Sequence, residues 1–131
     1  MRTNVLAIDP DPFSRKILQR ILTAAGSTVK IVQDTEEALD ALDVGHYDLM
    51  IINMPKLEPS TFDFVKLVRF THLGMAHLPV ILLSPPLTDC ARTRSEDAAI
   101  DTCLTKPVDP AELIDAMDNL TQKIQSIHHF H

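Results

Sequence analysis

The sequence predicts a three-layer α/β fold in which helices cover both faces of a parallel five-stranded sheet. Short apolar runs of strand length alternate along the chain with longer segments that have helical patterns. Most runs are apolar at nearly every position, which is typical of strands covered on both faces. Right-handed crossovers between such strands give a doubly wound sandwich. The expected strands are Asn4–Ile8, Thr28–Val32, Asp48–Ile52, Pro79–Leu83 and Asp101–Thr105.

The second of these runs differs from the others because its apolar residues alternate with polar ones. Val29 and Ile31 alternate with Thr28 and Lys30. In a strand, such alternation puts apolar side chains on one face and polar side chains on the other. We therefore expect this strand at an edge of the sheet.

The first helix is expected to open at Asp11, whose side chain is suited to capping the free N–H groups of the first turn. Pro12 suits the first helical position, and Gly26 is a stop signal. Helical spacing predicts an inward apolar face made of Phe13, Ile17, Ile21 and Ala24.

The other helices are expected to begin near Thr35, Ser60, Thr88 and Asp109. The segment from Thr88 to Ala98 is the most polar and the least patterned, whereas Asp109-Pro110 resembles a capping-box start. Inward residues are expected on the helices that begin near Thr35, Ser60 and Asp109. They are Ala38, Leu39, Leu42, Phe64, Val65, Val68, Leu113, Met117, Leu120 and Ile124.

Length and composition restrict the class of protein. The chain has 131 residues with 45% hydrophobic residues, which suits one globular domain. A net charge of -6 argues against direct binding of nucleic acid through its phosphates. No apolar run has the length of a membrane span or a signal peptide, and three glycines leave no Gly-rich phosphate loop. Cys90 and Cys103 lack zinc-type spacing, so we expect reduced thiols in a cytoplasmic protein.

We expect residues 1–126 to form one domain and residues 127–131 to form a frayed tail. The tail contains His128, His129 and His131. A metal site or a purification remnant is the alternative interpretation of these histidines, but a frayed terminus is favoured.

In an open parallel sheet, functional residues lie beyond the carboxyl ends of the strands. The segments at these ends are Asp9 to Asp11, Asn53 to Pro55, Ser84-Pro85 and Lys106-Pro107. The stretches that carry them are VLAIDPDPFSRKIL, YDLMIIN, LPVILLS and CLTKPVDPAEL. Over roughly residues 3–125, these stretches resemble the receiver domain of bacterial two-component response regulators.

The spacing of the polar residues supports this resemblance. Ser84 and Lys106 are 22 residues apart, as are the hydroxyl residue and the lysine of that family. The resemblance implies a flavodoxin-like (βα)5 sandwich with strand order 2-1-3-4-5. It also implies a cis peptide bond between Lys106 and Pro107.

The family's chemistry, as the resemblance implies it, is Mg²⁺-dependent phosphoryl transfer to an aspartate. An acidic pair holds the metal, and a hydroxyl residue and a lysine hold the phosphoryl oxygens. Asp9 matches the first acidic position, but Pro10 matches the second and offers no side-chain ligand. Asn53 matches the acceptor position, and a neutral carboxamide is a very poor nucleophile. Ser84 and Lys106 match the remaining two positions.

Two further departures lie outside the acceptor position. Cys103 stands where the family has an aromatic switch residue, and we expect it to be a small apolar filler. Pro85 and Pro86 stiffen the loop after Ser84. We expect Lys106 to pair with Asp9 or with Asn53 Oδ1, and Ser84 to satisfy a backbone group.

The sequence thus predicts a degenerate phosphorylation pocket at Asp9, Pro10, Asn53, Ser84 and Lys106, with Mg²⁺ binding weak or absent. The predicted function is a non-enzymatic signalling module that acts by protein–protein interaction. One alternative is an active phospho-receiver that uses Asp9 or Asp11, and another is an unrelated flavodoxin-like ligand binder.

The expected partners are a histidine kinase, an output domain or another signalling protein. The resemblance implies docking on the face formed by the fourth helix, the fifth strand and the fifth helix, and a homodimer is a further possibility. A coiled-coil-like seam on the fifth helix adds candidate interface residues, which are Leu120, Ile124 and Ile127.

Overall fold

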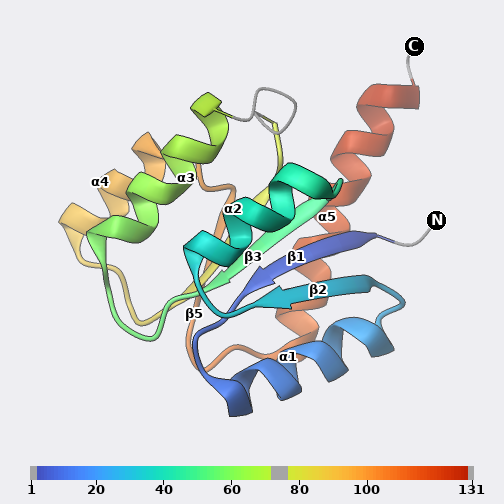
Figure 1. Ribbon diagram of the computed structural model, residues 1–131, viewed down its shortest axis with the longest axis horizontal. Coiled ribbons are helices and arrows are strands. Elements are labelled where there is room, and N and C mark those ends of the chain that lie inside the picture. The colour runs from blue at the N-terminus through green and yellow to red at the C-terminus, as the bar shows by residue number, and fades with distance from the viewer. Residues whose placement is uncertain (1–2, 72–76, 130–131) are drawn as a thin grey trace.

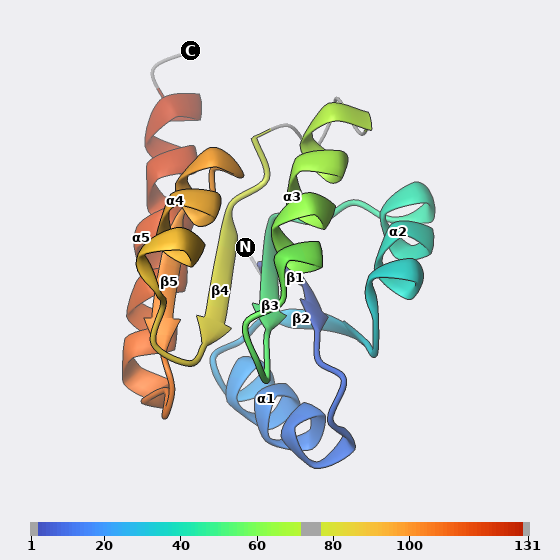
Figure 2. The ribbon, with the colours of Figure 1, turned by 90° about the vertical axis from the view of Figure 1, so that its left-hand side faces the viewer.

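The computed structural model describes residues 3–71 and 77–129, with side chains described as far as residue 121. Within this part of the chain, five strands form one parallel sheet of order β2-β1-β3-β4-β5 (Figures 1 and 2). The strands are β1 (Asn4–Ile8), β2 (Thr28–Val32), β3 (Leu49–Asn53), β4 (Val80–Ser84) and β5 (Thr102–Thr105). The helices are α1 (Pro12–Ala24), α2 (Thr35–Val44), α3 (Pro59–Thr71), α4 (Asp89–Asp97) and α5 (Pro110–His129). The predicted α/β fold and strand order are confirmed.

Two apolar clusters hold the three layers together, one on each face of the sheet. Alternate residues of β1, β3 and β4 point to opposite faces, so each of these strands contributes to both clusters. On one face they pack against α1 and α5, and on the other against α2, α3 and α4 (Figure 1). Because β3 and β4 are buried at every position, the nearly continuous apolar runs of the sequence are explained.

The strand boundaries agree with the sequence prediction to within one residue. β3 and β4 each begin and end one residue later than expected, so Asn53 and Ser84 are the last residues of their strands. β2 lies at the sheet edge as predicted, and its residues alternate between exposed and half-buried until Val32.

The predicted inward face of α1 is wrong in part. Phe13 is 72% exposed and Ile17 is 46% exposed, whereas Leu18 and Leu22 are the buried residues of this helix. The helix carries two apolar stripes, and periodicity alone does not tell which one faces the sheet. Leu18 and Leu22 pack against the sheet, whereas Phe13 and Ile17 stay exposed.

Capping contacts confirm the predicted starts of α1 and α4. Asp11 Oδ2 accepts a hydrogen bond from Ser14 N at 2.8 Å, and Thr88 Oγ1 accepts one from Ala91 N at 3.1 Å. The least patterned helix, α4, is therefore present, with only Ala91 and Ser95 buried.

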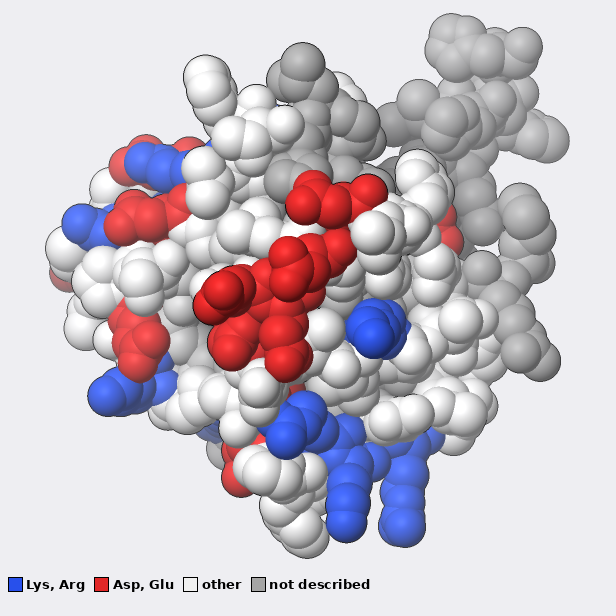
Figure 3. All heavy atoms as spheres, viewed as in Figure 1, with Lys and Arg blue, Asp and Glu red and all other residues white. Residues whose placement is uncertain are grey.

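Charged side chains are unevenly distributed over the face shown in Figure 3. Acidic side chains gather over α2, where Glu36, Glu37 and Asp40 are exposed, and basic side chains gather below them along α1. This view shows no continuous basic surface of the kind that binds nucleic acid. Among the described residues, no helix combines the length and the apolar character that crossing a lipid bilayer requires.

Candidate functional site

The predicted site residues lie at the carboxyl ends of their strands. Asp9 follows β1, Asn53 ends β3, Ser84 ends β4 and Lys106 follows β5. Asp9, Asn53 and Lys106 line one cavity of about 240 Å³, which we call the strand-end pocket. Ser84 and Pro10 do not line this cavity. The structure therefore brings together three of the five predicted residues.

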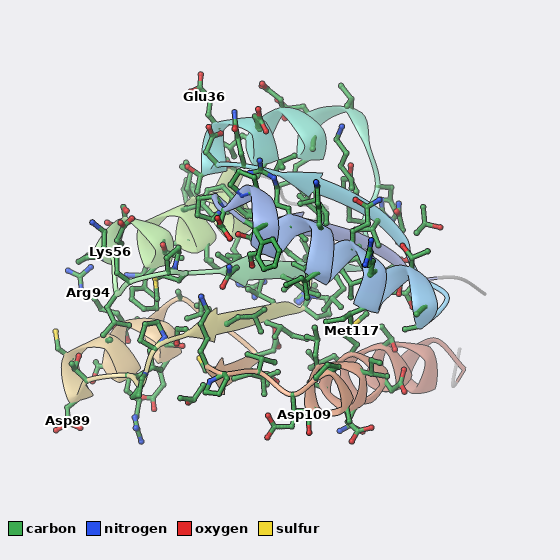
Figure 4. The ribbon with its side chains drawn as sticks, turned by 90° about the horizontal axis from the view of Figure 1, so that it is seen from below. Glu36, Lys56, Asp89, Arg94, Asp109 and Met117 are labelled. Carbon is green, nitrogen blue, oxygen red and sulfur yellow. The ribbon has the colours of Figure 1, made fainter. Side chains whose placement is uncertain are left out.

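Most of the remaining lining of the strand-end pocket is apolar and lies between α1 and the start of α5. Figure 4 views the molecule from the side of these two helices, with Asp109 marking the start of α5. Sequence reasoning did not find this wall, because it depends on how two helices far apart in the chain pack together. The apolar lining residues are Ile17, Leu18, Ile21, Leu83, Pro107, Val108, Pro110 and Leu113.

Asp9 is fully buried, and its two carboxylate oxygens differ in their contacts. Oδ1 accepts a hydrogen bond from Asp11 N at 3.0 Å, whereas Oδ2 has no hydrogen-bond partner among the residues that the structure describes. The backbone of Asp9 is fixed by Val32 O, which accepts from its N–H at 2.9 Å, and by Arg15 Nη1, which donates to its carbonyl at 2.9 Å. The backbone of Asp9 is thus held at both its N–H and its carbonyl, and its carboxylate keeps one acceptor that no described residue binds.

Asn53 is 7% exposed, and only one of the two polar atoms of its side chain makes a hydrogen bond within the described part of the chain. Its Nδ2 donates to Ser14 Oγ at 3.2 Å, whereas Oδ1 is buried and finds no partner in the described part of the chain. Ser14 also lines the strand-end pocket and was missed by the sequence analysis. Its place in the first turn of α1, which follows β1 after a short loop, was the available signal.

Lys106 makes a different contact from the one expected. Its Nζ donates to the Met54 carbonyl at 3.3 Å and not to Asn53 Oδ1, which no described residue binds. In the described part of the chain no ion pair joins Lys106 to Asp9. The lysine side chain reaches the backbone after β3 instead. Burial lowers the pKa of Lys106, and the negative charge of Asp9 opposes this effect.

Ser84 is buried and satisfies a backbone group, as expected. Its Oγ donates to the Pro85 carbonyl at 2.8 Å, within the loop that Pro85 and Pro86 stiffen. The Ser84 carbonyl accepts from Lys106 N at 2.8 Å, and the Lys106–Pro107 peptide bond is cis. The hydroxyl is therefore engaged in its own loop rather than in the strand-end pocket.

Cys103, at the switch position, is half-buried and packs against the apolar cluster on the side of α2, α3 and α4. Its Sγ lies 3.2 Å from Ser95 Oγ of α4. This contact fits the expected role of a small filler with a weak polar contact.

The donor atoms of the site do not match a Mg²⁺ site of the type that the resemblance implies. Mg²⁺ prefers hard oxygen ligands and keeps its water unless carboxylates compensate. Asp9 supplies one carboxylate, Asn53 supplies a neutral amide oxygen, and Pro10 supplies no side-chain ligand. Among the described residues, no group of three His, Cys, Asp or Glu side chains is placed to hold a metal.

Of the predicted interface side chains, the structure describes only that of Leu120. Leu120 is half-buried and packs against the cluster of α1 and α5. The side chains of Ile124 and Ile127 lie outside the described residues, as do those of His128, His129 and His131. The predicted boundary between domain and tail after residue 126 therefore stays a prediction.

Comparison with known proteins identifies similar sequences over most of the chain. The family profile described as response regulator receiver domain matches residues 5–118. The chain is 33% identical over 117 residues to the sensory/regulatory protein RpfC of Xanthomonas campestris, covering 88% of this chain and 16% of that protein. An uncharacterised 14.6 kDa protein of Leptolyngbya boryana is 31% identical over 111 residues, covering 85% of this chain and 84% of that protein. The chain thus spans about a sixth of the length of RpfC.

Solved structures show the same fold. The chemotaxis response regulator CheY4 of Vibrio cholerae has a TM-score of 0.80 at 24% identity, covering 92% of this chain and 99% of that chain. The receiver domain of the sensor histidine kinase PA1611 of Pseudomonas aeruginosa has a TM-score of 0.78 at 20% identity, covering 93% and 99%. That structure contains a magnesium ion coordinated in its active-site cleft.

Proposed function

Because the chain belongs to the response regulator receiver domain family, we propose that it is a signalling module that acts through protein–protein contact without phosphorylation of an aspartate. Receiver domains are signalling modules of two-component systems rather than classical enzymes. The family assignment replaces the alternative of an unrelated ligand binder. The proposal that the chain acts without phosphorylation rests on the residues of this chain.

The observation that carries the proposal is Asn53 at the end of β3. The family's acceptor needs an ionised carboxylate to attack phosphorus, and a carboxamide has no negative charge for this attack. The Asn53 side chain also donates to Ser14 Oγ, which ties it to α1. The position that would hold a nucleophile therefore holds a neutral group with a structural contact.

The surroundings of Asn53 support the same proposal. Pro10 supplies no ligand for a metal, so we propose that Mg²⁺ binds weakly or not at all. Ser84 Oγ donates a hydrogen bond to the Pro85 carbonyl, and Lys106 Nζ donates one to the Met54 carbonyl. Both groups that would hold phosphoryl oxygens thus have other partners.

The proposed partner is a protein of the signalling pathway, such as a histidine kinase or an output domain, in the cytoplasm. The resemblance implies docking on the face formed by α4, β5 and α5, and this face stays a prediction. Among the described residues, the large exposed apolar side chains lie elsewhere. They are Phe13 and Ile17 on α1, Val44 at the end of α2, and Leu67 and Phe70 on α3.

The test is the intact mass of the chain after incubation with acetyl phosphate and Mg²⁺. We expect no phosphoryl adduct on the unmodified chain and a labile adduct on the double variant Pro10→Asp, Asn53→Asp. The single variant Asn53→Asp should form little phosphoryl adduct, because it still lacks the second metal ligand. Pro10→Asp alone is the matched control, since it restores the ligand without the nucleophile.

Two outcomes would contradict the proposal. An acid-labile and hydroxylamine-labile adduct on the unmodified chain would mean that another carboxylate accepts phosphate. Asp9 would be the first candidate because its Oδ2 is unpartnered, whereas Asp11 Oδ2 caps α1. Strong Mg²⁺-dependent labelling of Asn53→Asp alone would show that Pro10 does not weaken the metal site.

A further inference from the structure

One side of the molecule carries charges of opposite sign on the two helices that flank an open sheet edge. β2 is the outermost strand and, within the described part of the chain, pairs only with β1. α2 covers one face of the sheet beside this edge, and α1 covers the other face (Figure 1). Figure 3 shows this side, with acidic side chains over α2 and basic side chains below them along α1.

Each of the two helices presents an exposed stripe of residues with a spacing of four. Residues four apart in a helix lie on the same face. On α2 the stripe consists of two acidic residues and one apolar residue, and on α1 it consists of two basic residues and one small residue. Figure 4 shows the first acidic residue, Glu36, pointing away from the molecule. The stripe of α2 is Glu36, Asp40 and Val44, and the stripe of α1 is Lys16, Arg20 and Ala24.

The charges of these stripes are not neutralised within the chain. The ion pairs among the described residues, Lys56 with Glu58 and Arg69 with Asp101, include none of the six stripe residues. Val44, the apolar member on α2, is 90% exposed. We call β2 and the two stripes together the β2-edge face. Because this face carries both an acidic and a basic stripe, it is complementary in charge to a second copy of itself.

Two copies can meet across this edge about two different twofold axes, and the charges select one of them. An axis perpendicular to the sheet would set α2 beside α2 and α1 beside α1, with like charges opposed. An axis parallel to β2 sets α2 of each copy against α1 of the other. Because β1, β2 and β3 are parallel, the helices that connect them run in the same direction, and this axis preserves that direction. The acidic and basic stripes then run side by side with the same spacing.

We propose that the chain forms a twofold dimer through the β2-edge face. In this dimer the basic stripe of each copy pairs with the acidic stripe of the other, Lys16 with Glu36 and Arg20 with Asp40. Val44 packs beside Ala24 at the ends of the two helices. The twofold axis repeats every contact, so four ion pairs form.

The charges of this interface act on orientation more than on affinity. An exposed ion pair contributes little to affinity and is screened by salt, whereas opposed like charges exclude the wrong arrangement. The dimer is therefore weak, sensitive to salt and specific in its geometry. This surface differs from the predicted docking face of α4, β5 and α5, so a second copy and a signalling partner would bind at different places.

The first test uses the unmodified chain without Mg²⁺ or phosphodonor, so its result does not depend on the proposed function. Sedimentation velocity at concentrations up to about 1 mM detects association as weak as millimolar. We expect a dimer at about 0.01 M salt and association at least about tenfold weaker at about 1 M, where the Debye length falls from about 30 Å to about 3 Å. A chain that stays monomeric at low salt, or a dimer that salt does not weaken, would overturn the inference.

The position of the interface is measured on the same unmodified chain by NMR. Backbone amide shifts of the ¹⁵N-labelled chain are followed as the protein is diluted at low salt. We expect the amides of α1, β2 and α2 to shift. Shifts confined to α4, β5 and α5 would place the dimer on another face and would contradict the proposal.

A pair of charge-reversed variants tests the pairing of the stripes. Lys16→Glu with Arg20→Glu makes both stripes acidic, and Glu36→Lys with Asp40→Lys makes both basic. Each variant alone should be monomeric, whereas an equimolar mixture should form a heterodimer, because an acidic stripe meets a basic stripe at both contacts. The variants move the net charge of -6 by four units, to -10 and to -2. Both therefore stay negative, and attraction between net charges does not explain a mixed dimer.

The matched control reverses two charges on another side of the molecule. Lys66→Glu with Arg92→Glu, at exposed positions of α3 and α4, gives the same net charge of -10 and should still form the dimer. Circular dichroism checks that each variant is folded. Dimerisation of either stripe variant alone, or a mixture of folded variants that stays monomeric, would refute the interface. The dilution series needs no variant, so it decides the question even if a variant does not fold.

Discussion

At the amino ends of β4 and β5 the polar groups hydrogen-bond to one another, whereas at the carboxyl ends of β1 and β3 two buried oxygens have no partner among the described residues. Arg69 of α3 organises the first region. Its Nε donates to the Ala98 carbonyl at 3.1 Å, its Nη1 to the Leu78 carbonyl at 3.1 Å and its Nη2 to the Ala99 carbonyl at 2.7 Å. Nη2 also lies 3.5 Å from Asp101 Oδ2, which accepts from Val80 N at 2.7 Å.

These contacts, which we call the Arg69 clamp, fix a strained turn. Ala99 has a φ of 58°, in the left-handed region that costs a non-glycine residue about 1–2 kcal/mol. The guanidinium binds the carbonyl of this same residue, so the clamp holds the end of α4 against the sheet. At the strand-end pocket, by contrast, Asp9 Oδ2 and Asn53 Oδ1 accept no hydrogen bond from any described residue. The comparison thus separates a region whose polar groups bind one another from a region in which two buried oxygens have no partner among the described residues.

The largest effect expected from this comparison follows removal of the clamp. Arg69→Ala leaves three backbone carbonyls and Asp101 without the guanidinium, and should lower the free energy of unfolding by about 2–4 kcal/mol. Urea unfolding followed by circular dichroism measures this change. Arg92→Ala, at an exposed position of α4, is the control and should change it by less than about 0.5 kcal/mol.

If Arg69→Ala lowered the free energy of unfolding by less than about 1 kcal/mol, water would be replacing the guanidinium at little cost. The variant Arg69→Lys sharpens the test. Lysine keeps the charge but lacks the planar fork, so it should recover only part of the lost stability.

The opposite result is expected in the strand-end pocket. Asn53→Leu keeps the number of side-chain heavy atoms and removes a buried oxygen that has no partner within the part of the chain that the structure describes. The lost hydrogen bond to Ser14 Oγ is worth about 0.5–1.5 kcal/mol, and the unsatisfied oxygen costs about 1–3 kcal/mol. The free energy of unfolding should therefore stay unchanged or rise by up to about 2 kcal/mol, as measured by urea unfolding.

Asn53→Ala is the matched control for shape. It removes the same polar atoms but leaves a cavity beside β3, so it should be less stable than Asn53→Leu. If Asn53→Leu instead unfolded more easily by over about 2 kcal/mol, the amide would be a structural group like Arg69, and the contrast between the two regions would fail.

The sequence was sufficient to predict the sheet because a parallel strand covered on both faces must be apolar at nearly every position. The alternation in β2 identified an edge strand for the same reason. The inward face of α1 was wrongly predicted in part, since a helix with two apolar stripes has two ways to pack, although Ile21 does pack against the core. Leu18 and Leu22, not Phe13 and Ile17, face the sheet.

The polar residues of the site could be predicted because strand ends are local in sequence and converge in a parallel sheet. Their partners could not be predicted. Lys106 Nζ donates to the carbonyl of Met54, which is 52 residues away in the chain, and this choice depends on side-chain packing. The Arg69 clamp was missed for the same reason, because its acceptors are backbone carbonyls that carry no sequence signal.

The smallest expected effect concerns the charge of Lys106. Burial lowers the pKa of this lysine below its ordinary value of 10.5, against the attraction of Asp9. Between the lowered pKa of the folded chain and 10.5, the unfolded chain binds more protons at this site. The free energy of unfolding of the unmodified chain should therefore rise, relative to that of Lys106→Met, as the pH increases towards 10.5. Because solvent screens a partly buried lysine, we expect a rise below about 1 kcal/mol.

Urea unfolding of both proteins at a series of pH values from about 8 upward measures this difference, with low salt to limit screening. Lys66→Met, at an exposed position of α3, is the control and should show no such trend relative to the unmodified chain. A difference that falls with pH would mean that Lys106 is stabilised as a cation in the folded chain. The lysine would then be bound to Asp9 in solution, and the strand-end pocket would already be satisfied from within, like the Arg69 clamp.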